Sequence, residues 1–260
     1  MDILGVKVDN LPRKEILEKV NNFLSEDRFH QIATINPEFI LEAGRDEDFR
    51  NILNNCDLNV ADGFGLKFAF WRSGEKLNFR IAGADLMEEI LRLAEKNNFK
   101  IFLAASSRGL SSWEETRDAI FKKYPKLEIG GKNYGCHSER SASEVEKANF
   151  NSVRSLAEFT PLNSGARDDI VTCDIVFANF GAPYQEKFLN SLKTAENSKI
   201  KLAMGVGGNF DFLTGKIKRA PVFMRKIGLE WLWRLFQQPR RIKRIFNAVV
   251  VFPIKMTFSK

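Results

Sequence analysis

Short apolar runs rich in β-branched residues alternate along this 260-residue chain with longer stretches of helical periodicity. This alternation predicts an α/β fold, in which a mostly parallel sheet carries helices on both faces. Ligands of such sheets bind beyond the carboxyl ends of the strands, so we look for chemistry there. The expected strands are Ile3–Val8, Gln31–Ile35, Leu58–Ala61, Lys100–Ala104, Leu127–Ile129, Ile175–Ala178 and Lys201–Met204, and the expected helices include Arg13–Leu24, Asp85–Lys96, Trp113–Lys123 and Gln185–Leu192.

One region between these elements breaks the alternation. Residues 136–169 are polar and poorly periodic, and they include Cys136 and His137. Such a segment cannot bury enough apolar surface to fold by itself. We therefore expect an exposed, partly disordered insertion without a catalytic role.

The C-terminal region has a different pattern. It predicts two helices, Val222–Phe236 and Arg240–Val251, separated by Pro239. Proline ends the helix before it and suits the first turn of the next one. We expect an α/β catalytic core at residues 1–218 and a basic amphipathic appendage at residues 219–260.

Charge is distributed unevenly along the chain. Residues 216–260 contain 12 Lys and Arg against one acidic residue, Glu230, so they carry +11 and residues 1–215 carry −4 of the net +7. This asymmetry predicts a polyanionic partner: nucleic acid, anionic lipid or a phosphorylated substrate. Cations mixed with Trp231 and Trp233 favour a helix that lies in a membrane interface, although a helix packed on the core with a solvated basic face fits the same pattern. No nucleic-acid-reading motif accompanies the charge, so we expect no nucleic acid partner.

Cysteine and histidine usage excludes several chemistries. The cysteines are Cys56, Cys136 and Cys173, an odd number without a C-x-x-C pair, which argues against a disulfide framework or a zinc site and favours a reducing compartment. With only His30 and His137, a histidine-based triad or metal site is not expected. Since there is also no clustered Asp-x-Asp motif, we predict neither a metal nor another cofactor.

The beginning of the chain has neither a basic segment nor a long apolar segment of the signal-peptide type. No run reaches the roughly 18 apolar residues of a transmembrane helix. We therefore expect a cytoplasmic protein that binds peripherally to the inner face of the cell membrane.

Polar side chains follow two of the expected strands. Asp62 comes directly after Leu58–Ala61 and precedes Gly63, which permits close approach of a ligand. This carboxylate is either a helix N-cap or a general base. Thr34 and Asn36 lie two residues apart at another strand end, so they point to the same side. They either cap the next helix or orient a sugar or phosphate.

An arginine and two glycine turns complete the candidate residues. Arg80 can hold a diphosphate through two parallel hydrogen bonds, or it can form a surface ion pair. One turn begins at Gly181, and the other contains Gly205, Gly207 and Gly208, each after an expected strand. Both have the position of an anion-binding turn, but neither has the spacing of a dinucleotide-binding or Walker motif, and ordinary tight turns fit equally well.

Taken in order, these motifs resemble the WecG/TagA/CpsF family of bacterial glycosyltransferases. The resemblance covers nearly the whole chain. It rests on Thr34-x-Asn36-x-Glu38, Asp62-Gly63, Arg80-x-x-Gly83-x-Asp85, Gly181-x-Pro183-x-Gln185-Glu186, Gly205-Val206-Gly207-Gly208-x-Phe210-Asp211, Arg219-Ala220-Pro221, and Gly228-Leu229-Glu230-Trp231-x-x-Arg234-Leu235 through Pro239-Arg240.

The resemblance implies a Rossmann-like core and an inverting transferase. The donor would be a UDP-sugar, typically UDP-N-acetylmannosamine, and the acceptor undecaprenyl-diphosphate-linked N-acetylglucosamine, in cell-surface polysaccharide or teichoic acid synthesis. Self-association is also implied as a possibility. Asp62 matches the family's general base. The other residues carried over are Thr34, Asn36, Arg80 and Gln185 as active-site polar groups, Gly181, Gly205, Gly207, Gly208 and Asp211 in the donor pocket, and Arg219, Arg234, Arg240, Arg241 and Arg244 at the lipid diphosphate and membrane.

Two alternatives stay open at this point. One is a catalytically idle peripheral membrane protein that binds anionic lipid through the basic appendage. The other is a related transferase with a different sugar donor or lipid-linked acceptor. Polar residues near several predicted strand ends favour an enzyme over the idle protein.

Overall fold

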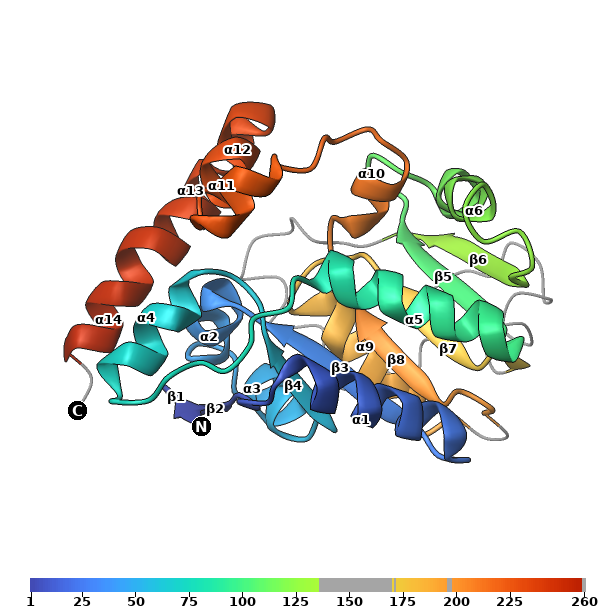
Figure 1. Cartoon of the computed structure of the whole chain (residues 1–260), viewed down its shortest axis with the longest axis horizontal. Coiled ribbons are helices and arrows are strands. Elements are labelled where there is room, and N and C mark those ends of the chain that lie inside the picture. The colour runs from blue at the N-terminus through green and yellow to red at the C-terminus, as the bar shows by residue number, and fades with distance from the viewer. Residues whose placement is uncertain (136–169, 171, 196–197, 259–260) are drawn as a thin grey trace.

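Six parallel strands form the central sheet of the protein, in the order β4-β3-β8-β7-β5-β6 (Figure 1). The computed structural model describes residues 1–135, 170, 172–195 and 198–258. The predicted insertion at residues 136–169 lies outside them. The α/β fold with a mostly parallel sheet is confirmed. The strands are β3 (His30–Ile35), β4 (Leu58–Ala61), β5 (Ile101–Ser106), β6 (Ile129–Tyr134), β7 (Ile175–Ala178) and β8 (Leu202–Gly205).

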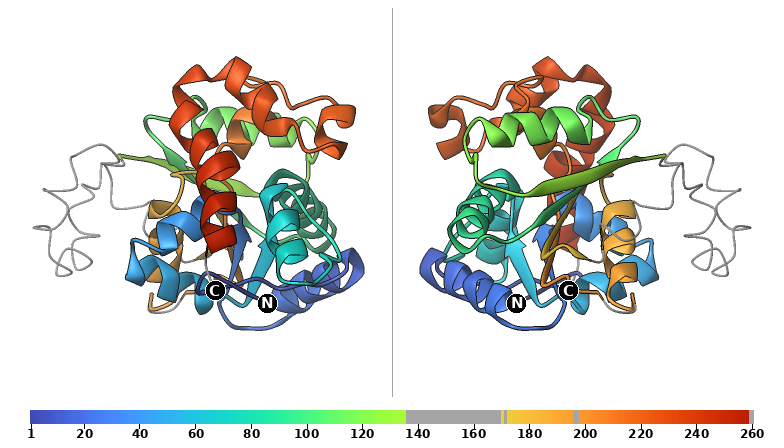
Figure 2. Two further views of the ribbon diagram at one scale, coloured as in Figure 1. Left: turned by 90° about the vertical axis from the view of Figure 1, so that its left-hand side faces the viewer. Right: turned by 90° about the vertical axis from the view of Figure 1, so that its right-hand side faces the viewer.

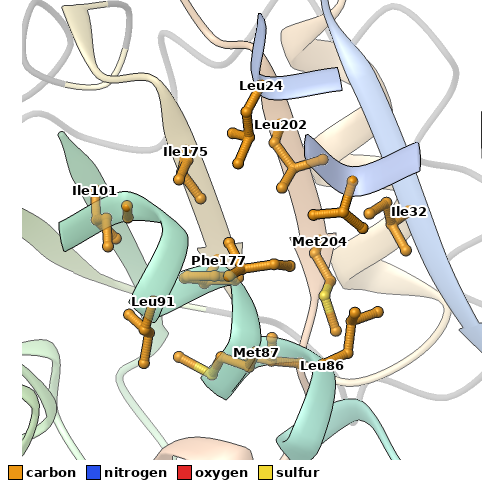
Figure 3. Packing of buried hydrophobic residues seen from close by; sticks show 14 of the residues in the cluster. Leu24, Ile32, Leu86, Met87, Leu91, Ile101, Ile175, Phe177, Leu202 and Met204 are labelled. Atoms are coloured by element: carbon orange, nitrogen blue, oxygen red, sulfur yellow. The ribbon is translucent and has the colours of Figure 1, made fainter. Parts of the chain in front are cut away.

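Helices cover both faces of this sheet, as its nearly continuous apolar strands require. On one face α1 (Arg13–Ser25), α5 (Gly83–Asn97) and α6 (Trp113–Phe121) pack on alternate strand residues such as Phe177 and Met204 (Figure 3). The opposite face packs on α2 (Pro37–Ala43), α3 (Glu47–Asn54) and α9 (Tyr184–Leu192).

The strand register brings several carboxyl ends to one edge of the sheet. Ile35 pairs with Ala61, and Ala178 pairs with Gly205. The residues that follow these ends are therefore neighbours in space. Asn36 fixes the first of them, because its side-chain oxygen accepts the backbone N–H groups of Glu38 and Phe39 and so starts α2.

Two of the predicted strands are wrong in detail. Ile3–Val8 is not a strand of the sheet but a small antiparallel hairpin of β1 (Asp2–Ile3) and β2 (Val6–Lys7). Its chain reverses at Leu4 and Gly5, which both have positive φ. The strand predicted at Leu127–Ile129 begins only at Ile129 and continues through Tyr134, because pairing with β5 outweighs the weak β propensity of its glycines.

The C-terminal helices also differ from their predicted bounds. The first predicted helix, Val222–Phe236, is interrupted at Gly228, which has a φ of +81°. The second starts with a 3-10 turn and continues beyond Val251 to Phe258. The observed elements are α11 (Val222–Lys226), α12 (Glu230–Gln237), the 3-10 turn Pro239–Arg241, α13 (Ile242–Phe246), the π-helical turn Asn247–Val251 and α14 (Phe252–Phe258).

These helices pack against the core through α4 (Gly65–Arg72), which lies beside α14 (Figure 2). Phe252 and Met256 join the buried cluster that contains Phe70. A second contact lies at Gly228, where an added Cβ would come within 2.4 Å of the Phe64 ring. In the described part of the chain, no helix has the length and apolarity needed to cross a bilayer.

Replacing Gly228 with alanine tests the contact between the core and the C-terminal helices. We expect the left-handed backbone to cost about 1–2 kcal/mol and the clash with Phe64 a further 1–3 kcal/mol or so. Gly74→Ala is the matched control, since Gly74 also has positive φ (+75°) but has open space around it. Denaturant unfolding measures both variants, and equal losses of stability would contradict this packing.

Candidate active site

A cavity of about 200 Å³ opens beyond the carboxyl ends of β3 and β4. Its floor comes from the strand ends and from the start of α5, and its roof comes from the C-terminal helices. Sequence reasoning placed chemistry at this edge of the sheet. Three predicted site residues of the core line it, namely Asn36, Asp62 and Arg80. Four more come from the appendage, namely Arg219, Arg234, Arg241 and Arg244.

Asp62 stands at the floor of this cavity. Its backbone N–H donates to the carbonyl of Ile35 at 2.7 Å, which continues the pairing of β3 with β4. Its Oδ2 accepts the backbone N–H of Gly83 at 3.3 Å, at the start of α5. Burial raises the pKa of Asp62 above its usual value, and the charge of Arg80 and the Gly83 hydrogen bond oppose the shift without cancelling it. Asp62 is therefore a stronger base than an exposed aspartate.

Arginines dominate the walls of the cavity. Six of them face it against three acidic residues, Glu38, Asp62 and Glu230. Such an excess of positive charge suits a ligand with several anionic oxygens. The six arginines are Arg80, Arg219, Arg225, Arg234, Arg241 and Arg244.

Three contacts hold the appendage arginines in place. Arg219 forms an ion pair with Asp85 at 2.7 Å, and Arg244 donates from Nε to Glu38 at 2.7 Å. The guanidinium of Arg234 lies 4.7 Å from the centre of the Phe212 ring. Burial raises the pKa of Asp85, but the hydrogen bond and charge of Arg219 outweigh it, so the net shift is downward and the pair stays ionised.

Other arginines in the cavity lack full compensation. Burial, and then the nearby charges of Arg244 and Arg234, lower the pKa of Arg241 to about 10. Among the described residues, the Nε atoms of Arg219 and Arg225 are buried without a hydrogen-bond partner. A buried donor without a partner costs free energy. The Nε–H groups of these two arginines are therefore suited to donate hydrogen bonds to an anion that enters from solution.

Thr34 and Gln185 lie outside the cavity wall. Thr34 is buried beneath Gly83, the residue whose N–H holds Asp62. Gln185 is also buried, and its Oε1 accepts the N–H groups of Gly181 and Gly207, both at 3.1 Å. It thus joins the two glycine turns. Gly205 passes so close to it that an added Cβ would lie 2.4 Å from the Gln185 amide nitrogen.

The glycine turns and Asp211 form a second group, next to the cavity. Asp211 lies on α10 (Asn209–Leu213), directly after Gly208. Its Oδ1 accepts the hydroxyl of Ser111 at 2.8 Å. Asn209 and Phe212, from the same helix, do line the cavity, so α10 connects the two groups.

Several lining residues were not predicted as site residues. They include Asn209, Arg225 and Glu230. Arg225 belonged to the basic appendage pattern, but no periodicity of the sequence distinguishes an arginine facing a cavity from one facing solvent. The side chain of Arg240, which was predicted to meet the lipid diphosphate, lies outside the described part of the structure.

A parallel α/β sheet with a strand-end carboxylate beneath an arginine-lined cavity has the form of an enzyme acting on a phosphorylated substrate. The chain belongs to the glycosyl transferase WecG/TagA/CpsF family, whose family model matches residues 1–260. It is therefore a glycosyltransferase, as the resemblance predicted, and the idle membrane protein is set aside.

Relatives with assigned activities are similar over most of the chain. A protein of Staphylococcus aureus (strain MRSA252), named N-acetylglucosaminyldiphosphoundecaprenol N-acetyl-beta-D-mannosaminyltransferase, is 29% identical over 262 residues, which cover 100% of this chain and 93% of the relative. A protein of Bacillus subtilis (strain 168) with the same name is 29% identical over 218 residues, or 83% of this chain and 75% of the relative.

Two substitutions should shift the pKa of Asp62 in opposite directions, which tests its electrostatic environment. The charge of Arg80 lowers the pKa of Asp62 and that of Glu230 raises it. We expect Arg80→Gln to move this pKa further up and Glu230→Gln to move it down. The carboxyl-carbon NMR signal of Asp62, identified by its loss in Asp62→Asn, reports both shifts. Shifts of the same sign would show that these charges do not act on Asp62.

Proposed function

We propose that this chain transfers N-acetylmannosamine, with inversion, from UDP-N-acetylmannosamine to undecaprenyl-diphosphate-linked N-acetylglucosamine. The names of the relatives support the transferred sugar and the acceptor. The observation that carries the proposal is that Asp62 faces the same cavity as six arginines. The proposed base and the proposed binding site for a diphosphate thus line the same cavity.

Asp62 is the proposed general base. It removes the proton from the acceptor hydroxyl while that oxygen attacks the anomeric carbon of the donor. The bond from this carbon to the diphosphate breaks on the opposite face, and UDP leaves with the electron pair. General-base catalysis contributes about 10²–10⁴-fold, and the raised pKa of Asp62 brings its basicity closer to that of the attacking hydroxyl.

The two glycine turns are the proposed donor site. The N–H groups of Gly181 and Gly207 already donate to Gln185, so the other backbone N–H groups of these turns would bind the departing diphosphate of UDP. Gln185 fixes both turns through its side-chain oxygen, and Thr34 supports Gly83 behind Asp62. Both are therefore proposed as positioning residues. Asp211 and the glycines around it are proposed to contact the nucleotide.

The appendage arginines are the proposed site of the acceptor diphosphate. Their ion pairs with Glu38 and Asp85 dock the C-terminal helices over Asp62, so the site is complete only when these helices are in place. Residues 219–260 would also hold the enzyme on the cytoplasmic face of an anionic membrane, where its lipid-linked acceptor resides.

Asp62→Asn tests the base directly. The amide keeps the shape of the side chain but cannot take a proton, so we expect kcat to fall about 10²–10⁴-fold. UDP affinity, measured by calorimetry, should stay within about twofold of wild type. Asp118→Asn is the control, because Asp118 lies exposed on α6. Wild-type turnover in Asp62→Asn would refute the assignment.

Arg241→Gln tests the acceptor site. Loss of a charge-assisted hydrogen bond of about 1.5–3 kcal/mol should raise KM for a soluble diphosphate-linked acceptor by roughly 10–150-fold, with the donor KM unchanged. Lys243→Gln is the matched control, since Lys243 lies two residues further on, is exposed and does not line the cavity. If both variants raise the acceptor KM equally, Arg241 acts only through the net charge of the appendage, and the assignment of a direct contact is wrong.

A further inference from the structure

The solvent-facing side of α4 carries large apolar groups although α4 belongs to the core. Trp71 is 73% exposed and Phe64, just before the helix, is 44% exposed. Lys67 lies between them, with its Nζ 5.0 Å from the centre of the Phe64 ring. Positions 64, 67 and 71 share one side of a helix. Exposed aromatic groups with flanking cations are the composition of a membrane-interface surface.

A second exposed apolar surface lies on the C-terminal helices, where α14 packs beside α4. Every fourth residue from Ile242 to Phe258 is apolar and exposed. In an α-helix such a row drifts by about 40° per step, but the π-helical turn Asn247–Val251 takes more residues per turn and offsets part of the drift. The row thus stays on one side of the continuous helix. Its members are Ile242, Phe246, Val250, Ile254 and Phe258.

The two surfaces meet at the mouth of the cavity. Phe64 and Gly65 line it from the start of α4, and Ala248 and Val249 line it from the π-helical turn. An added Cβ at Gly65 would lie 3.7 Å from the carbonyl oxygen of Ala248, so the two walls are close neighbours. The lining of the cavity thus combines these apolar residues with the six arginines.

We propose that α4 is a second membrane-contacting element, in which Phe64 and Trp71 insert into the bilayer interface while Lys67 and Arg72 contact anionic headgroups. Core and appendage would then hold the cavity mouth against the membrane from both sides. This proposal rests on the proposed function, because a lipid-linked acceptor whose diphosphate binds the arginines must extend out of this cavity, past its apolar lining residues, into the bilayer.

The exposed apolar surfaces of α4 and the C-terminal helices could face an anionic bilayer or a second copy of the chain, and their charge favours the bilayer. The exposed cations of α4 lie beside an appendage with 10 Lys and Arg and one acidic residue. A two-fold contact through this face would bring the same cations together. Each cation near an anionic surface instead strengthens membrane binding by about fivefold.

Binding of full-length variants to vesicles tests the proposal. With phosphatidylcholine vesicles containing 30% or so phosphatidylglycerol, we expect Trp71→Ala to bind about tenfold more weakly than wild type, and Lys67→Gln with Arg72→Gln to lose about 25-fold. Phe121→Ala is the control, since it removes an exposed aromatic group from α6 on another side of the molecule (Figure 1). It should bind like wild type.

Two further measurements separate the outcomes. Brominated lipids should quench the fluorescence of wild type more than that of Trp71→Phe. Transfer to a soluble acceptor analogue should be the same in Trp71→Ala and wild type. Unchanged vesicle binding and quenching, a loss of activity on the soluble analogue, or a change in oligomeric state on sedimentation would each overturn the proposal. Vesicle binding needs no sugar substrate, so failure of the transferase assignment would show separately, as absent transfer by wild type.

Discussion

Repulsion among the arginines of one cavity is the constraint on which the site depends. Six arginines line one cavity with Asp62, and burial, followed by the charges of Arg244 and Arg234, lowers the pKa of Arg241. The arrangement persists because Glu38 and Asp85 neutralise Arg244 and Arg219 at the edges. The remaining excess of charge is best relieved by an anionic ligand. Binding of a diphosphate and closure of the C-terminal helices over the base are therefore coupled in this account.

In the proposed function, the same coupling gives the helical appendage a role in chemistry as well as in location. Its arginines reach a carboxylate that belongs to the core, and α14 buries Phe252 and Met256 in a cluster of the core. A helix that served only as a membrane tether would need neither contact. In the proposal, a lipid chain leaves the site past the apolar lining residues of α4 and the π-helical turn. Charge inside and apolar surface outside match the two halves of a lipid-linked diphosphate.

Much of this arrangement was predictable because parallel strands place their carboxyl ends at one edge. Asp62 and Asn36 follow from that rule, and the order of motifs along the chain added Arg80 and the appendage arginines. Gln185 was predicted as an active-site group, but its bonds to both glycine turns depend on how α9 packs under two loops. Arg225 was not predicted as a site residue. The predicted helix is interrupted at Gly228, and no periodicity of the sequence encodes how this break orients α11 relative to α12. The hairpin at Ile3–Val8 was missed because two residues with positive φ outweigh a strand-like pattern.

The central claim is that one cavity holds both the base and the acceptor diphosphate. A crystal structure with UDP and a soluble diphosphate-linked N-acetylglucosamine tests it most directly. We predict that an Asp62 oxygen lies within about 2.6–3.2 Å of an acceptor hydroxyl, with the acceptor diphosphate on Arg225 and Arg241. An acceptor diphosphate bound at the glycine turns, with Asp62 out of reach of every acceptor hydroxyl, would contradict the account.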